Sequence, residues 1–407
     1  MGMVLISSLS WGQESSSKKV QVIGPKSKDK EKFIAPYWDD RSESFRNNQV
    51  PNFIFSSPSG DFSLGVGGLI NLTSSYGFGG ISNNIDFVTY SIPIPKNPDD
   101  NQQYQMYANT SELFFKVVQK TNHGNIIGYF STNFRGVNNN LQIWQVYVKY
   151  RGFEVGQDWS SFVDLGAQPA TVNFAGINSM PEALNLLMRY SGKLGKGWSA
   201  GISVEAPNFN AGFANTKSLK QRMPDIPAYL RYDFGQSHVK LAGIVRSLRY
   251  FDDNSNEGTN VFGWGGALTG SFKLSPKFQL YANGVYGEGI APYIQDLSVA
   301  GLNTLPSGAS SGKLEALPAW GYYGALQYNA TPTLSFAGMF GQVKVLPGDR
   351  YYTDSFYSYA QQITVNMFWN FLPNAQFALE YDWGRLVDQG GAVGRANRAY
   401  LMLQYNF

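Results

Sequence analysis

Six basic side chains recur on consecutive stretches of alternating polar and apolar residues. If these stretches lie side by side, the basic groups form a row that could attract anions. If these stretches are β-strands with one face in water, the basic groups project to that face. Rows of fixed charge decide which ions enter a wet passage, and each contact in water is weak enough to permit release. The predicted pore-lining and solute-binding residues are Lys149, Arg151, Arg189, Arg231, Lys240 and Arg246.

Acidic residues occupy the same alternate positions as the basic ones, and two interpretations of their role remain open. Glu380 and Asp382 could face the basic wall and produce a transverse field that favours carboxylates. Alternatively, acids and bases could pair and simply hydrate the wall. The acidic set is Glu112, Asp158, Glu205, Asp233, Glu380 and Asp382.

The chain offers little for catalysis. It has no cysteine and 2 histidines, so thiol nucleophiles, thiolate metal sites and disulfides are excluded. His123 falls in a predicted turn and His238 at a strand start, and neither position suits a base for a serine nucleophile. We therefore expect no enzyme, metal or cofactor. The net charge of +3 is too small to argue for nucleic acid binding.

The composition is typical of a β-barrel in a membrane. Charged and aromatic residues each make up 15% of the chain, which also contains 44 glycines, whereas soluble domains carry about 25% charged residues. Mean hydropathy is nevertheless −0.25. No run of about 18 apolar residues occurs, so a bundle of membrane helices is excluded.

Side-chain polarity alternates with a period of two from Asp61 onward, which predicts strands. In the last segment, Leu401, Leu403 and Tyr405 fall on one face and Tyr400 and Gln404 on the other. The pattern predicts an all-β, transmembrane antiparallel barrel of about sixteen strands. Their predicted starts lie near Asp61, Asn109, Asn125, Leu141, Phe153, Asn185, Gly197, Ala228, His238, Val261, Phe278, Ala319, Thr331, Gln361, Ala375 and Arg398.

The connections alternate between tight turns and long polar loops. Short periplasmic turns alternating with long external loops are typical of outer-membrane barrels, whose even strand number leaves both chain ends in the periplasm. Long loops are predicted at roughly 73–108, 160–184, 206–226, 249–259, 288–317 and 345–359.

Aromatic residues cluster where predicted strands meet loops, as expected of girdles at the two membrane interfaces. The set is Trp144, Tyr150, Trp159, Trp198, Trp320, Tyr322, Trp369 and Trp383. The chain ends on Phe407, and a terminal Phe on an amphipathic strand resembles the recognition signal of the outer-membrane assembly machinery.

The N-terminal part divides into two segments before the barrel. Residues 1–13 resemble a signal-peptide remnant, with an apolar run and small residues but no basic start. Residues 14–55 are polar and lysine-rich, which predicts a flexible periplasmic leader. Residues 56–407 are assigned to the transmembrane barrel.

The most distinctive stretch runs from Gly156 to Asp164, Gly-Gln-Asp-Trp-Ser-Ser-Phe-Val-Asp, and continues to Phe174-Ala175-Gly176. It resembles the G-Q-x-W-S-T-F-x-D pattern of the DcaP-like outer-membrane porins, as does Asp86-Phe87-Val88 leading to Ser91-Ile92-Pro93. The resemblance implies a homotrimeric channel in the bacterial outer membrane for small hydrophilic, often anionic solutes, dicarboxylates among them. A helical coiled-coil extension, present in better-known members, is not evident at the N-terminus.

The loop after Trp159 is long and apolar for an external loop. Exposing Phe162, Val163 and Phe174 to water would be costly, so the loop is expected to fold into the barrel and narrow it. The predicted constriction residues are Trp159, Phe162, Asp164 and Phe174. The alternative is that the loop packs at a trimer interface or on the rim.

These observations favour a porin for passive diffusion of small hydrophilic solutes, with modest preference for anions and with neutral solutes also admitted. The barrel would contact outer-membrane lipid. The main alternative is a structural or adhesin barrel with a plugged lumen. An outer-membrane lipid hydrolase is disfavoured, because no histidine is placed near the outer-leaflet rim.

Overall fold

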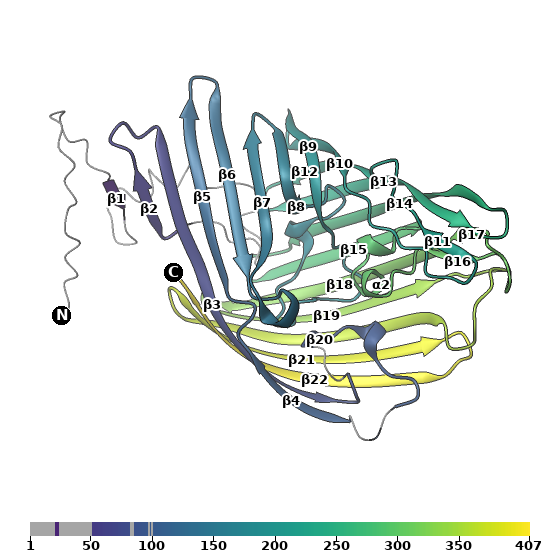
Figure 1. Ribbon diagram of the computed structural model, residues 1–407. Helices are drawn as coiled ribbons and strands as arrows, with labels where there is room; N and C mark the ends of the chain where they lie inside the picture. Colours follow the sequence, from purple (N-terminus) through teal and green to yellow (C-terminus); the bar gives the residue numbers. More distant parts are fainter. Residues whose placement is uncertain (1–20, 24–50, 82–84, 97, 99–100) are drawn as a thin grey trace.

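The computed structural model describes residues 21–23, 51–81, 85–96, 98 and 101–407. Within these residues, sixteen antiparallel strands form one closed sheet, with almost no helix (Figure 1). The predicted barrel is confirmed, and strands β8, β15 and β21 begin at the predicted residues. The barrel strands are β3 (Phe62–Phe78), β5 (Glu112–Thr121), β6 (Gly124–Asn133), β7 (Gln142–Tyr150), β8 (Phe153–Trp159), β9 (Leu184–Gly195), β10 (Trp198–Glu205), β12 (Ile226–Phe234), β13 (Ser237–Asp252), β14 (Glu257–Lys273), β15 (Phe278–Glu288), β18 (Pro318–Thr331), β19 (Leu334–Val345), β20 (Tyr357–Leu372), β21 (Ala375–Asp388) and β22 (Val393–Asn406).

The sheet closes where the last strand pairs with the first. β22 pairs with β3 from Asn397↔Phe78 to Asn406↔Leu69, and the backbones of Gly68 and Phe407 exchange two hydrogen bonds of 2.9 Å. The other edge of β3 is covered by β4 (Gln102–Tyr107) and then β5. Closure satisfies the backbone groups that an open sheet would leave at its edges.

Two short strands extend the sheet at the end of the barrel that carries the tight turns. β2 (Phe53–Ser56) pairs with β3, and β1 (Gln21–Ile23) pairs with β2; both lie near the C-terminus in Figure 1. Strand β2 buries Ile54. The sequence predicted only a polar leader here, because such short runs carry little periodicity. Apart from residues 21–23 and 51–55, the predicted segments 1–13 and 14–55 lie outside the described residues.

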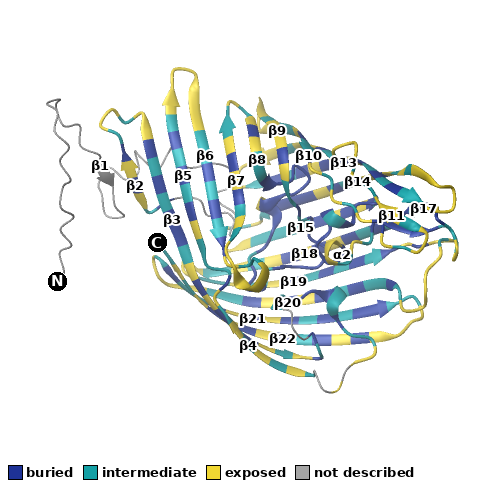
Figure 2. Ribbon diagram, in the orientation of Figure 1, coloured by how far each residue is buried: buried dark blue, intermediate teal, exposed yellow. Residues whose placement is uncertain are grey.

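The strands alternate between an exposed apolar outer face and a covered inner face (Figure 2). On β22, Leu401 and Leu403 are 42% and 44% exposed, whereas Tyr400 and Met402 are buried. This is the alternation expected where one face meets acyl chains and the other faces the lumen. No helix in the described part of the chain is long and apolar enough to cross a membrane, a finding that does not bear on crossing by strands.

Three long connections pack inside the barrel, where the sequence predicted one. Segment 160–183 is joined there by 85–95 and by 289–317, which contains α2 (Gln295–Ala300). Their buried apolar residues form one cluster with the inner wall, including Phe87, Phe162, Tyr293 and Leu297. The long connection predicted at 288–317 is present between β15 and β18. It differs from the predicted polar loop because its apolar residues pack in one buried cluster with the other two segments and the wall.

The backbone at Gly156 leaves no space for a side chain. Its φ is +145°, and an added Cβ would lie 2.1 Å from the carbonyl oxygen of Val146. We expect Gly156→Ala to lower the free energy of unfolding by about 1–3 kcal/mol, measured as the midpoint of heat-induced unfolding on semi-native gels. Gly192→Ala, with open space around its Cβ, is the control. Equal midpoints for the two variants would contradict this prediction.

Candidate functional site

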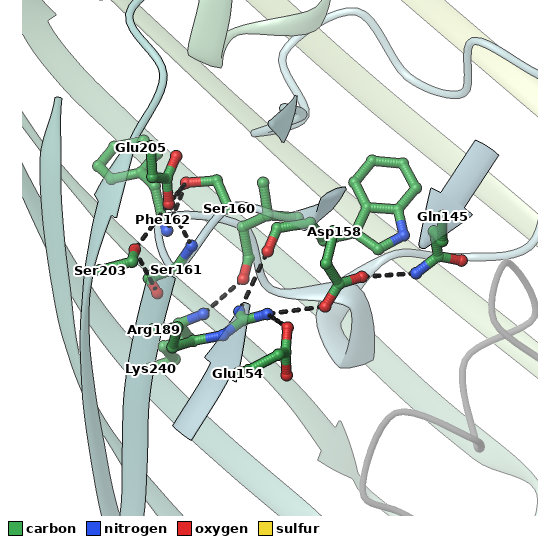
Figure 3. Close-up of polar contacts among 12 residues, drawn as sticks. Gln145, Glu154, Asp158, Ser160, Ser161, Phe162, Arg189, Ser203, Glu205 and Lys240 are labelled. Atoms are coloured by element: carbon green, nitrogen blue, oxygen red, sulfur yellow. Dashed lines mark hydrogen bonds and ion pairs between the residues drawn. The ribbon is translucent and has the colours of Figure 1, made fainter. Parts of the chain in front are cut away.

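Segment 160–183 crosses the lumen and is hydrogen-bonded to several strands of the inner wall. Near its start, the Ser160 hydroxyl and the Ser161 N–H donate to Glu205 Oε1 at 2.9 and 3.0 Å (Figure 3). Halfway along the segment, the N–H groups of Val172 and Asn173 each donate to Glu380 at 2.7 Å. Glu205 and Glu380, predicted only as lumen charges, therefore anchor the loop from β10 and β21.

Asp164 holds the first part of the loop against β13 and β14. Its Oδ2 lies 3.0 Å from His238 Nε2 and accepts a 2.5 Å hydrogen bond from Thr269. Burial by itself raises the pKa of Asp164, but the His238 hydrogen bond and nearby positive charges outweigh it and hold the pKa well below the ordinary carboxyl value. The predicted constriction residue is thus an anchor, and His238 is its partner.

The return of the loop is held by β15, β18 and β20. Asn178 N–H donates to Gln362 Oε1 at 2.9 Å, and the Ser179 hydroxyl donates to the Tyr322 carbonyl at 2.7 Å. Asn283 donates to the Ser179 carbonyl at 3.1 Å. Together with Glu205, Asp164 and Glu380, these contacts attach the loop to the wall from β10 to β21.

The distinctive sequence stretch builds the base of this loop. Gln145 donates to Asp158 at 2.5 Å, and Asp158 accepts from Arg189 at 2.7 Å (Figure 3). Trp159 is 2% exposed and packs edge-on against Trp144, with ring centroids 5.7 Å apart. Phe162 is fully buried against Tyr293. These residues therefore fix where the loop leaves β8.

Four of the six predicted pore-lining bases are bound to neighbouring carboxylates or to a loop carbonyl. Arg189 bonds to Glu154 and Asp158, and Arg246, 2% exposed, bonds to Asp225 at 2.9 Å. Lys240 is buried beneath the loop and donates to the Val163 carbonyl. Arg231 lies 3.8 Å from Asp164 and pairs at 2.7 Å with Asp233.

The remaining two bases lie toward the turn end. Lys149 is half-buried on β7, opposite Glu154 of β8 in the strand register. Arg151 is exposed in the β7–β8 turn, where its φ is +50°. Because Arg151 lies in a turn, it is not part of the barrel wall. The predicted row of basic residues therefore ends at Lys149.

The other two inward segments meet at a buried carboxylate. Asp296 of α2 accepts hydrogen bonds from the Thr89 hydroxyl and the Tyr357 hydroxyl, each 2.7 Å, and from Tyr90 N–H at 2.8 Å. Burial raises the pKa of Asp296. No periodic signal marked this contact, since both segments were predicted as loops.

A cavity of about 1140 Å³ occupies the lumen between the loop and the turn end. Its lining is mostly polar, and carboxamides are prominent. Its charged members include Glu112, Arg231, Asp233 and Lys273, two of each sign. Among the predicted constriction residues, Trp159 and Phe174 line it, whereas Phe162 and Asp164 are buried in the loop's attachment. Within the described residues no acidic, histidine or cysteine cluster could hold a metal.

Comparison with known proteins decides the family. Residues 91–402 match the family described as the Porin subfamily. The chain belongs to the porin family. No curated protein matches this porin.

Solved structures show the same fold at low sequence identity. The outer membrane channel DcaP of Acinetobacter baumannii is 18% identical, with a TM-score of 0.75 over 85% of this porin and 97% of that chain. The anion-selective porin from Comamonas acidovorans is 11% identical, with a TM-score of 0.56 over 85% and 100%. A trimer form of OmpT of Vibrio cholerae is 10% identical, with a TM-score of 0.52 over 85% and 99%. The predicted DcaP-like porin is confirmed in family and fold, and this porin is a channel of the bacterial outer membrane and not an enzyme.

The Asp164 anchor predicts a local effect. Replacing Asp164 by Asn removes a charge-assisted hydrogen bond worth about 1.5–3 kcal/mol, so the amides of the loop should exchange hydrogen faster. In the unchanged protein, the lowered pKa of Asp164 means that its ionised carboxylate stabilises the fold at pH values above the ordinary carboxyl pKa. This stabilisation is lost as the pH falls through the lowered pKa. Asp233→Asn, whose side chain is 45% exposed, is the control. Unchanged exchange in Asp164→Asn would contradict the anchoring role.

Proposed function

We propose that this porin lets small hydrophilic solutes diffuse passively across the outer membrane, with a modest preference for anions such as dicarboxylates. The observation that carries the proposal is the polar lumen cavity of about 1140 Å³ that remains beside the inward loop. A barrel of this strand number encloses an aqueous channel unless its loops fill it. Its wall offers many hydrogen-bonding side chains to a passing solute.

The preference for anions is expected to be small. Arg231 and Lys273 line the cavity and would favour carboxylates, but Arg231 also pairs with Asp233. Arg189, Lys240 and Arg246 are engaged in holding loops. The fold shared with an anion-selective porin supports the direction of the preference and not its size.

We further propose a homotrimer in outer-membrane lipid, in line with the trimer form among the structural relatives. Phe407, paired to β3 at the barrel seam, is the proposed contact for the assembly machinery. A plugged structural or adhesin barrel remains the second candidate, because three connections pack inside the half of the barrel that carries the long loops.

Planar bilayers separate these candidates. The purified trimer should conduct ions, and reversal potentials in a salt gradient should favour anions slightly. Arg231→Gln should reduce that preference, whereas Arg222→Gln, an exposed loop residue, should not. Silent trimers would favour the plugged barrel, and preference for cations would remove the anion proposal while keeping the channel.

Shortening the loop should widen the passage. Deleting residues 162–174 should raise single-channel conductance, because the segment crosses the lumen to β21. Glu380→Gln, which keeps the loop but weakens one of its anchors, should increase current fluctuations without that rise. Unchanged conductance in a deletion variant that still shows a folded barrel on gels would show that the segment does not limit flow.

A further inference from the structure

Between the loop and the wall opposite its anchors lies a gap that belongs to the lumen cavity. The anchors lie on β10 to β21, whereas the cavity continues along the opposite wall past Gln404 of β22, Asn71 of β3 and Glu112 of β5. Phe174 is one of the loop residues that line this cavity. It is only half-buried, although Asn173 and Ala175 beside it are buried.

Trp144 packs against Phe174 beside this gap because of an irregularity in β7. Ser131 of β6 pairs with Gln145, but the next residue, Thr132, pairs with Ile143. Trp144 is therefore the extra residue of a β-bulge, a feature that re-aims a side chain. The indole lines the cavity, and its ring centroid lies 5.4 Å from that of Phe174 in an edge-to-face arrangement.

The bulge is held by the distinctive sequence stretch. Gln157 Nε2 donates to the carbonyl oxygens of Trp144 at 2.9 Å and Ile143 at 3.3 Å, so the displaced backbone stays satisfied. Trp159 supports the indole from the side. The inward tryptophan is thus a built feature. Its prediction as part of an interface girdle was wrong, because alternation does not reveal an inserted residue.

Polar groups suited to hydroxyls face the same gap. Asn71 and Gln404 are hydrogen-bonded to each other at 3.2 Å, and the Tyr129 hydroxyl lies 3.5 Å from Glu112; all four line the cavity. Carboxamides both donate and accept, and a carboxylate accepts from hydroxyls. Arg135 lies over one face of Phe174, 4.1 Å from the ring centroid, and is ion-paired with Asp86. Its charge is therefore compensated, and that face of the ring is occupied.

We propose that Trp144 and Phe174 form a stacking subsite for the ring of a neutral carbohydrate. The C–H face of a sugar ring is apolar and can cover an aromatic ring, while its hydroxyl edge reaches the amides and Glu112. A dicarboxylate would meet Glu112 at close quarters and gain nothing from the rings. The subsite deepens the proposed diffusion function and rests on it.

The test measures uptake into liposomes that contain the trimer. Glucose uptake should saturate with concentration, because a bound ring occupies the subsite, whereas uptake of open-chain sorbitol should rise linearly. Trp144→Ala and, separately, Phe174→Ala should raise the half-saturating glucose concentration about five- to ten-fold. Trp144→Phe should retain most of the effect. Trp264→Ala, a tryptophan that is 41% exposed on β14 and absent from the cavity lining, is the matched control.

Several outcomes would overturn the subsite. Linear uptake of both glucose and sorbitol would do so, while ion conductance would leave the channel proposal standing. Saturation with succinate or choline instead of glucose would assign the rings to charged solutes. Saturation that survives both alanine variants, whose folding is checked on gels, would place binding elsewhere. Absence of both conductance and uptake would reject the channel and the subsite together.

Discussion

The requirement that every backbone N–H and C=O in a lipid-facing wall be paired governs this molecule. Hydrocarbon offers no hydrogen bonds, so a sheet that faces it must close on itself. The pairing of β22 with β3 along Asn397–Asn406 completes the circuit, and the terminal Phe407 continues it to Gly68. Once the wall is closed, inward side chains and loops can only meet in the lumen, and their packing there determines how much of it remains open.

The charged side chains in this lumen mainly hold the inward loops in place. Glu205 and Glu380 accept backbone N–H groups of the inward loop, and Arg246 binds Asp225 in the half of the barrel that carries the long loops. A buried ion whose partner is removed is costly, which makes these contacts strong restraints on the loops. The same pairing leaves little uncompensated charge toward the cavity. A row of bases in a sequence is therefore a poor measure of the field that a solute meets.

The sequence predicted what depends on local repetition. Period-two alternation located the first residues of β8, β15 and β21, because each strand has one face in lipid and one in the lumen. The apolar loop after Trp159 was predicted to fold inward because water would penalise it. The partners of that loop were not predictable, since Asp164 and His238 are 74 residues apart and come together only when the sheet closes. The same holds for Asp296 and Thr89, which are 207 residues apart.

The distinctive stretch from Gly156 to Asp164 combines a local sequence signal with contacts to neighbouring strands. Gly156 permits close approach to Val146, Gln157 satisfies the bulged carbonyls, and Asp158 joins Gln145 to Arg189. Each contact reaches a neighbouring strand, and together they place one aromatic ring on the wall and send the loop across the lumen. All of these contacts are needed to hold the loop and the ring in place, so together they determine the shape of the passage. The stretch therefore fixes the shape of the constriction and positions the ring of Trp144 at the cavity.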